Sequence, residues 1–129
     1  MPRITALYAA PLALLFVVLA FLVIRQRYRT HTAIGTGNDP GLERAVRVHA
    51  NFAEYVPIAL LLILLAELLG AAGWWLHLSG AGLLAGRALH AYGVSRSPEN
   101  LRLRMMGMVL TFSVIIAGAI AVAVQALTR

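Results

Sequence analysis

The sequence contains no cysteine and no lysine, and it carries few charged residues of either sign. The lack of cysteine excludes disulfides, thiolate metal sites and a cysteine nucleophile. Only 12% of the residues are charged, against about 25% in an ordinary soluble domain. So few charged side chains could not cover the surface of a small soluble domain. These deficits exclude a typical cytosolic enzyme, a disulfide-rich secreted domain and a disordered chain.

Long hydrophobic runs dominate what remains. The chain is 60% apolar, its mean hydropathy is +0.81, and four runs approach the roughly 20 apolar residues that a spanning helix needs. They cover residues 4–24, 52–69, 68–86 and 105–128. The first run is too long for a signal peptide and precedes arginines rather than a cleavage site, so we expect a retained helix.

Turn-forming residues separate these runs. Residues 70–73 have glycine at both ends and predict a tight hairpin, and the breaker-rich segment 35–41 predicts a real loop. The sequence therefore predicts an all-α membrane protein, a four-transmembrane-helix bundle that forms a single domain over residues 1–129. The expected helices cover about 4–27, 42–69, 73–94 and 101–127.

All eleven basic residues are arginine, and their distribution predicts the orientation. Eight arginines lie in or beside the first and third connections, whereas two lie at the termini. We therefore expect these two connections to face the cytoplasm and both termini to lie on the opposite side. The arginines flank hydrophobic runs instead of forming one polar face, which argues against nucleic-acid binding. The eight are Arg25, Arg27, Arg29, Arg44, Arg47, Arg96, Arg102 and Arg104.

A polar stripe runs along the start of the second predicted helix. Glu43, Arg47, Asn51 and Glu54 follow helical spacings of four, four and three residues and so share one face. Glu54 lies where the helix turns apolar, and an ionisable group at that depth indicates a functional site by default. The alternative is structural. Glu43 and Arg47 would then form a surface ion pair, Asn51 would form a hydrogen bond between helices, and Glu54 would neutralise an arginine of a neighbour.

The third predicted helix carries a second polar pair. Arg87 and His90 are three residues apart, at about the same depth as Asn51. The structural alternative is an ion pair between Arg87 and Glu54, and the functional one is an arginine directed at an anionic ligand. Gly82 and Gly86 form a small-residue pattern that permits close helix packing.

The remaining ionisable residues offer no metal site. The four histidines do not follow a metal-ligand spacing. His77 beside two tryptophans predicts interfacial placement, and Glu67, near the second connection, predicts a snorkelling or paired carboxylate.

The polar groups of the second and third helices suit a ligand with carboxylates, an ammonium group and amides. Arginine binds carboxylates through two hydrogen bonds, a carboxylate binds an ammonium, and asparagine satisfies a peptide group. Clustered arginines would also favour the thiolate of a bound thiol. Glutathione has all of these groups, although a phospholipid headgroup or an organic phosphate would also fit.

The motif Glu43-Arg44-x-x-Arg47-x-His49-x-Asn51-x-x-Glu54, followed by Pro57, resembles the signature of the membrane-associated proteins in eicosanoid and glutathione metabolism, the MAPEG family, and particularly its bacterial branch. The segment 86–90 is similar to the family's third-helix segment. The resemblance implies a homotrimer that binds glutathione between subunits near the cytoplasmic side. The residues it implies for that site are Arg25, Arg47, His49, Asn51, Glu54, Arg87 and His90.

The start of the fourth predicted helix departs from the family. Prostaglandin E synthase-like members have an arginine–serine pair and a tyrosine there, whereas this chain offers only Arg102 and Arg104 as thiolate stabilisers. Val94 replaces a tyrosine expected in the third helix. We therefore expect a glutathione-binding protein of the bacterial inner membrane, a transferase or peroxidase that acts on lipophilic electrophiles or lipid hydroperoxides. The alternative is a non-catalytic structural or ligand-sensing member; a transporter is disfavoured because no inverted repeat is visible.

Overall fold

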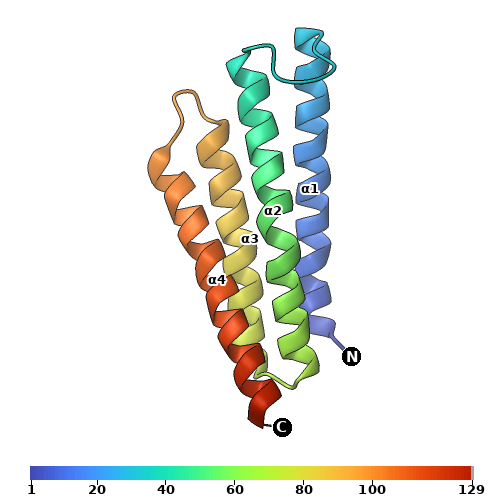
Figure 1. The fold of residues 1–129 in the computed structure, drawn as a ribbon, viewed down its shortest axis with the longest axis vertical. Coiled ribbons are helices and arrows are strands. Elements are labelled where there is room, and N and C mark those ends of the chain that lie inside the picture. The colour runs from blue at the N-terminus through green and yellow to red at the C-terminus, as the bar shows by residue number, and fades with distance from the viewer. Residues whose placement is uncertain (129) are drawn as a thin grey trace.

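The structure is a computed structural model that describes residues 1–128, and these residues form four helices and no strand. The helices are α1 (Arg3–Thr30), α2 (Pro40–Leu68), α3 (Gly73–Ser95) and α4 (Leu101–Thr128). They run up and down beside one another as an elongated bundle (Figure 1). The predicted all-helical bundle is therefore confirmed.

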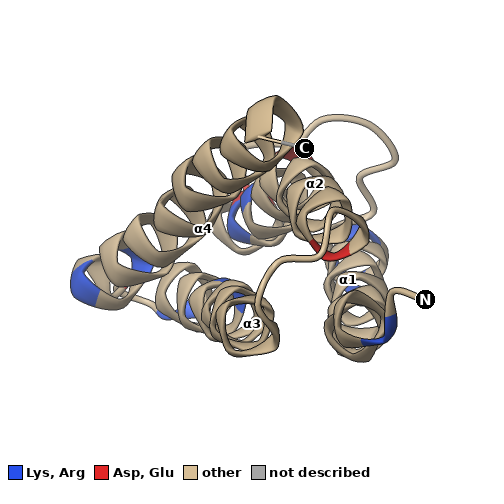
Figure 2. Ribbon diagram, turned by 90° about the horizontal axis from the view of Figure 1, so that it is seen from below, with Lys and Arg blue, Asp and Glu red and all other residues tan. Residues whose placement is uncertain are grey.

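The two inner helices hold the bundle together. Helices α2 and α3 each pack against all three others, whereas α1 and α4 do not touch each other within the described residues. Seen along the bundle, α1 and α4 lie on opposite sides (Figure 2). The first and third connections lie at the same end of the bundle, which we call the arginine-rich end (Figure 1). The second connection and both termini lie at the other end.

Three of these helices are long and apolar enough to cross a membrane: α1, α2 and α4. Helix α3 has 23 residues, and its buried positions include the polar residues Ser79, Arg87 and His90. The other three helices shield this polar face from lipid. A membrane helix tolerates such residues when they face the bundle interior.

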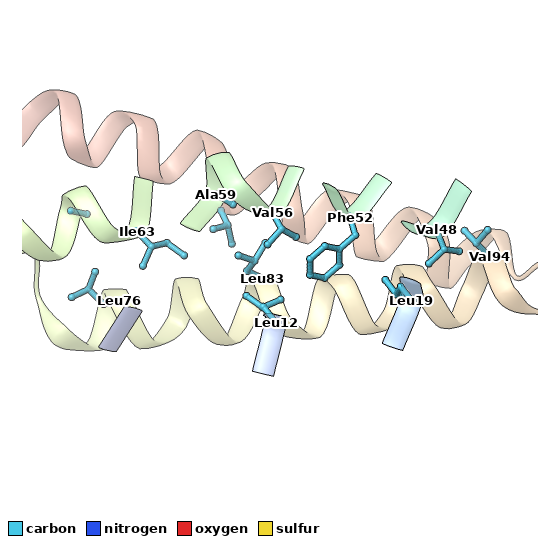
Figure 3. Close-up of a cluster of buried hydrophobic side chains, with 12 residues drawn as sticks. Leu12, Leu19, Val48, Phe52, Val56, Ala59, Ile63, Leu76, Leu83 and Val94 are labelled. Carbon is cyan, nitrogen blue, oxygen red and sulfur yellow. The ribbon is translucent and has the colours of Figure 1, made fainter. Parts of the chain in front are cut away.

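An apolar core runs through the length of the bundle (Figure 3). The buried positions of α2 recur every three to six residues, which puts them on one side of the helix. Phe52 lies at the middle of this side, next to Leu12 of α1 and Leu83 of α3 (Figure 3). The opposite side of α2, which includes Glu54 and Leu61, remains exposed.

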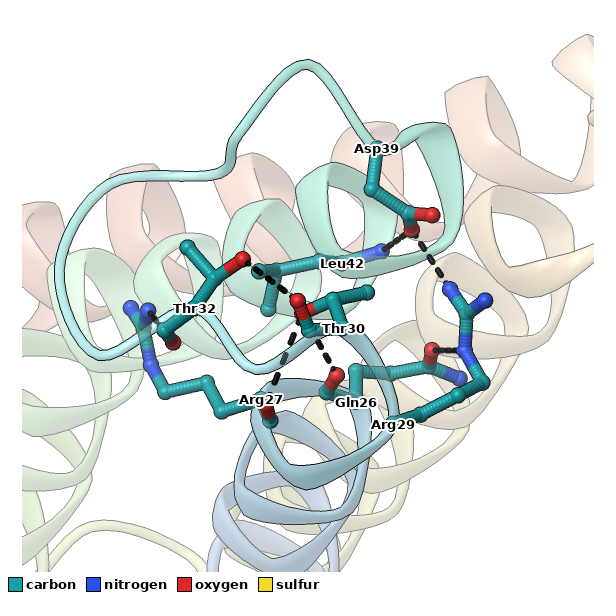
Figure 4. A network of polar contacts seen from close by, with 7 residues as sticks. All are labelled: Gln26, Arg27, Arg29, Thr30, Thr32, Asp39 and Leu42. Atoms are coloured by element: carbon teal, nitrogen blue, oxygen red, sulfur yellow. Dashed lines mark hydrogen bonds and ion pairs between the residues drawn. The ribbon is translucent and has the colours of Figure 1, made fainter.

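Hydrogen bonds close the first connection and begin α2 (Figure 4). The Asp39 carboxylate accepts a hydrogen bond from the Leu42 N–H at 2.8 Å and pairs with the Arg29 guanidinium at 2.6 Å. Pro40 follows at the first helical position, where a missing N–H costs nothing. Arg27 donates to the carbonyls of Thr32 and Gly35, so the loop folds back on α1.

Glu67 serves as a cap for another helix. Its carboxylate accepts hydrogen bonds from the backbone N–H groups of Ile4 and Thr5, at 2.8 and 2.7 Å, and from the Thr5 hydroxyl at 2.6 Å. The first N–H groups of a helix have no partner within it, and a carboxylate there also meets the positive end of the helix dipole. Glu67 is therefore paired, with the N-terminus of α1 rather than with a cation.

Glycines let α3 and α4 approach closely. A Cβ added to Gly107 would lie 2.5 Å from the Gly86 carbonyl oxygen and 2.6 Å from the His90 backbone nitrogen. Real Cβ atoms do not approach other atoms so closely. The predicted packing role therefore holds for Gly86. The other half of the pattern, Gly82, has room, since its added Cβ would lie 3.5 Å from Val114.

We expect Gly107→Ala to destabilise the bundle, because the new methyl group meets backbone that cannot give way. Overpacking of this kind costs roughly 1–3 kcal/mol. Gly82→Ala is the matched control on the same interface and should be at least as stable as the wild type, because its methyl group has room and alanine favours the helix. Denaturant unfolding in mixed micelles measures both. Equal stability of the two variants would contradict the close α3–α4 approach.

Candidate functional site

A cavity of about 490 Å³ opens at the arginine-rich end of the bundle. Its walls come from α2, α3 and the segment that leads into α4, so three parts of the chain that are distant in sequence form it. The size suits a small-molecule ligand, for which pockets of roughly 300–1,000 Å³ are typical. The lining residues are Pro40, Glu43, Arg44, Arg47, Asn51, His90, Val94, Pro98, Glu99 and Arg104.

The wall from α2 carries most of the polar stripe. Glu43, Arg47 and Asn51, spaced one helical turn apart, all line the cavity. Arg44 joins them, although the spacing of the stripe did not include it. Glu54 does not: it is exposed one turn deeper, at the level of the apolar core residues Phe52 and Val56.

The floor of the cavity is formed by Asn51 and His90, with Arg87 behind them. Arg87 is 1% exposed and His90 is 3% exposed. The Nη2 nitrogen of Arg87 lies 2.6 Å from the Asn51 Oδ1 oxygen and 3.2 Å from the His90 Nδ1 nitrogen. Arg87 does not line the cavity itself, so it contacts a ligand only through these two side chains.

The Arg87 guanidinium has neutral partners on its other side as well. Its Nη1 nitrogen donates to the Thr111 hydroxyl at 3.4 Å and to the Met108 sulfur at 3.8 Å, and its carbon lies 5.8 Å from the centre of the Phe52 ring. The buried Nε nitrogen has no hydrogen-bond partner among the residues that the structure describes. Within residues 1–128 no carboxylate lies within ion-pair distance of Arg87, so the alternative ion pair with Glu54 is not formed.

The remaining wall leads into α4 and contains an ion pair. The Arg104 Nη1 nitrogen lies 3.1 Å from both carboxylate oxygens of Glu99. Both residues line the cavity, and Glu99 was not among the predicted site residues. Arg102 is exposed and lines a separate shallow depression on the outside of this connection.

Two other predicted site residues lie outside the cavity. Arg25 is exposed on α1. The His49 ring stacks on the Phe16 ring, with centroids 4.8 Å apart. Helix α1 contributes nothing to the lining, so a single subunit brings together Arg47, Asn51, His90 and Arg104 without these two.

The cavity and its immediate surroundings are positively charged. Arg44, Arg47 and Arg104 line it and Arg87 lies behind its floor, against the two carboxylates Glu43 and Glu99. Among the described residues, no three histidine or carboxylate side chains lie close enough to hold a metal ion. The arrangement favours an anionic organic ligand that also carries a positive group for Glu43.

Comparison with known proteins identifies the family to which this chain belongs. The sequence profile of the MAPEG family matches residues 5–124, nearly the whole chain. The chain belongs to the MAPEG family. Two relatives, both called inner membrane protein YecN, come from Escherichia coli strains K12 and O6:H1. Each is 41% identical over 109 residues, which cover 84% of this chain and 82% of the relative. The family resemblance predicted from the motif of the second helix is thus confirmed.

The charge of Asp39 helps to begin the helix that carries most of the site. The hydrogen bond from the Leu42 N–H lowers the pKa of the Asp39 carboxyl below its ordinary value of 3.8, and the Arg29 guanidinium lowers it further, although slight desolvation opposes both. A carboxyl whose folded-state pKa is lowered stabilises the fold above its unfolded-state pKa. That contribution is lost as the pH falls through the folded-state pKa.

We expect Asp39→Ala to loosen the start of α2 at neutral pH, because the Leu42 N–H loses its acceptor. Hydrogen exchange should quicken at Leu42 and Glu43 while the middle of α2 stays protected. Asp39→Asn is the control, since it keeps an acceptor oxygen and removes only the charge. The difference in thermal stability between wild type and Asp39→Ala should shrink below pH 3.8. An unchanged difference in acid would contradict a role for the charge.

Proposed function

We propose that the protein binds glutathione in the cavity at the arginine-rich end and uses its thiol on lipophilic substrates, as a membrane-embedded transferase or peroxidase. One observation carries this proposal. Arg44, Arg47 and Glu43 line one cavity together with the Asn51–His90 floor. A compact site that combines guanidinium groups, a free carboxylate and amide donors matches a zwitterionic peptide with two carboxylates.

Each part of glutathione has a complementary group in the cavity. The guanidinium forks of Arg44 and Arg47 suit its two carboxylates, because arginine binds carboxylates through two hydrogen bonds. The guanidinium groups of Arg44 and Arg47 have no hydrogen-bond or ion-pair partner within the described residues. Glu43 suits the ammonium group, and the thiol would lie towards the floor.

The bilayer would supply the second substrate. If α1, α2 and α4 span the bilayer, as their length and composition allow, the cavity at the end of the bundle would lie at a membrane surface. An electrophile or hydroperoxide dissolved in lipid would then reach the ligand without crossing water. The arginine-rich end would face the cytoplasm by the positive-inside rule, in an inner membrane such as that of the YecN relatives.

We further propose a homotrimer assembled through the exposed side of α2. Glu54 is exposed at a depth where an ionised carboxylate costs free energy unless it has a partner. A neighbouring copy would enclose Glu54, and it would also bring the exposed Arg25 of one subunit towards the cavity of the next.

The Glu99–Arg104 ion pair favours a second candidate, a ligand-sensing member without catalysis. Arg104 is already bound to a carboxylate, and the serine and tyrosine of the prostaglandin E synthase-like members are missing. Ultraviolet absorbance of the bound thiolate separates the two functions. A thiolate signal supports the enzyme, and saturable binding without it supports the sensor.

Arg47→Ala should weaken glutathione binding by about tenfold or more, since it removes a charge-assisted hydrogen bond worth roughly 1.5–3 kcal/mol. Calorimetry of the purified protein in detergent measures the dissociation constant. Arg96→Ala is the matched control. Arg96 lies at the same end, but its guanidinium bonds to Tyr92 alone among the described side chains and does not line the cavity. Equal affinity of the two variants would move the binding site elsewhere.

Native mass spectrometry in mild detergent should show three copies of the 13.9 kDa chain. Glu54→Gln should dissociate this trimer at lower detergent concentration, because it removes a charge that the interface must pair. Glu99→Gln, which removes a carboxylate outside the bilayer-embedded region, is the control and should leave the trimer intact. A monomeric wild type would contradict the assembly.

A further inference from the structure

We propose that the outer side of the α3–α4 connection binds the phosphate of an anionic phospholipid between the guanidinium groups of Arg96 and Arg102. Both residues line a shallow depression of about 460 Å³ that residues 96–102 form. Pro98 and Glu99 line this depression as well as the cavity described above, whereas Arg96 and Arg102 do not line that cavity. The lipid site is therefore separate from the proposed glutathione site and goes beyond the proposed function.

The depression carries two positive charges that no carboxylate of the described residues neutralises. The chain has eleven arginines and only five acidic residues. Glu99 is the acidic residue of this connection, and both of its carboxylate oxygens lie 3.1 Å from Arg104. Within residues 1–128, no carboxylate lies within ion-pair distance of Arg96 or Arg102. Like charges that share one depression repel each other, and an anion between them offsets that repulsion.

Contacts with Tyr92 hold the Arg96 side chain in place. Its Nη1 nitrogen donates to the Tyr92 hydroxyl at 3.1 Å, and its guanidinium carbon lies 5.3 Å from the centre of the Tyr92 ring. A guanidinium has five N–H donors, so most of them remain for a ligand. Arginine binds phosphate through two parallel hydrogen bonds, and a side chain that is already ordered loses less entropy on binding. Ser97, which also lines the depression, adds a hydroxyl donor.

The surface below the depression indicates a lipid rather than a free phosphate. Leu101 lines the depression and is 58% exposed. Exposed apolar residues continue from it along α4 at helical spacings of four, four, three and four, so they form one stripe. If α4 spans the bilayer, as its length and composition allow, the depression would lie at the membrane surface and the stripe among the acyl chains. The stripe consists of Leu101, Met105, Val109, Phe112 and Ile116.

The charges of the depression favour an anionic headgroup over a zwitterionic one. Phosphatidylglycerol has the negative charge of its phosphate alone. Phosphatidylcholine adds a quaternary ammonium group, which would meet the two arginines and find Glu99 already paired. Each arginine near a membrane surface raises the affinity for an anionic lipid by about fivefold. Arg102 thus has a role outside the glutathione cavity, in place of the thiolate stabilisation that the family resemblance implied.

Native mass spectrometry of the purified protein, titrated with phosphatidylglycerol or phosphatidylcholine in mild detergent, tests this site. The wild type should bind phosphatidylglycerol more tightly, by about tenfold or more, and Arg96→Ala and Arg102→Ala should each weaken this binding by about fivefold. Arg25→Ala is the matched control. It removes the same charge from an exposed position at the same end but lies outside the depression, so it should bind phosphatidylglycerol like the wild type. A wild type without this preference, or equal losses in Arg25→Ala and Arg102→Ala, would overturn the site.

A second pair of measurements tests the geometry and the source of the phosphate. The double variant Arg96→Lys, Arg102→Lys keeps both charges but loses the paired hydrogen bonds of the guanidinium groups. It should bind phosphatidylglycerol less tightly than the wild type, and equal affinity would overturn the proposed arginine site. Glycerophosphoglycerol, the same headgroup without acyl chains, should bind at least about tenfold more weakly than the lipid, because it buries no apolar surface. Equal affinity of the two would assign the depression to a soluble phosphodiester and overturn the lipid site.

Calorimetry with glutathione separates this proposal from the proposed function. Arg96→Ala should bind glutathione like the wild type while it binds phosphatidylglycerol less tightly. Glutathione binding without a preference for phosphatidylglycerol would overturn the lipid site alone. A preference for phosphatidylglycerol that Arg96→Ala reduces, in a protein that does not bind glutathione, would support the lipid site and overturn the proposed function.

Discussion

The burial of one guanidinium organises this bundle. Arg87 lies among α2, α3 and α4 and binds Asn51 of the first, His90 of the second and Thr111 of the third. A charge inside a membrane protein persists only where its hydrogen bonds are supplied by neighbouring helices. Among residues 1–128 the hydrogen-bond partners of Arg87 are the side chains of Asn51, His90, Met108 and Thr111, and no carboxylate lies within ion-pair distance of it.

The glycines of α3 and α4 make that burial possible. Gly86, the residue before Arg87, and Gly107 bring the two backbones into contact beside His90. Thr111, one turn along α4, donates to the Gly107 carbonyl and can therefore accept from Arg87. The close packing of α3 and α4 and the hydrogen bond between Arg87 and Thr111 therefore share one stretch of the interface, and a bulky residue at either glycine would disturb both.

Much of this was predictable from the sequence, and the remainder depended on contacts between helices. Hydrophobic runs predict the helices, and the helical spacing of Glu43, Arg47 and Asn51 predicts a polar face, because both follow from local periodicity. The spacing of residues along the chain does not show which acceptor Arg87 binds. Glu54 and Asn51 both lie at about the same depth in the bundle as Arg87. The rotation of α2 about its axis decided between them, since it turns Asn51 inwards and Glu54 outwards. The sequence predicted a paired Glu67 but not its partner, the N-terminus of α1. The Glu99–Arg104 ion pair and the stacking of His49 on Phe16 were not predicted either, because each depends on a contact with a loop or with another helix.

The most direct test of this account is a crystal structure of the protein with glutathione, grown from lipid, in which the anomalous signal locates the ligand's sulfur. The account predicts glutathione in the cavity at the arginine-rich end, with its carboxylates on the guanidinium groups of Arg44 and Arg47 and its ammonium group on Glu43. A ligand bound elsewhere would contradict the account, as would glutathione in the cavity with its carboxylates away from Arg44 and Arg47.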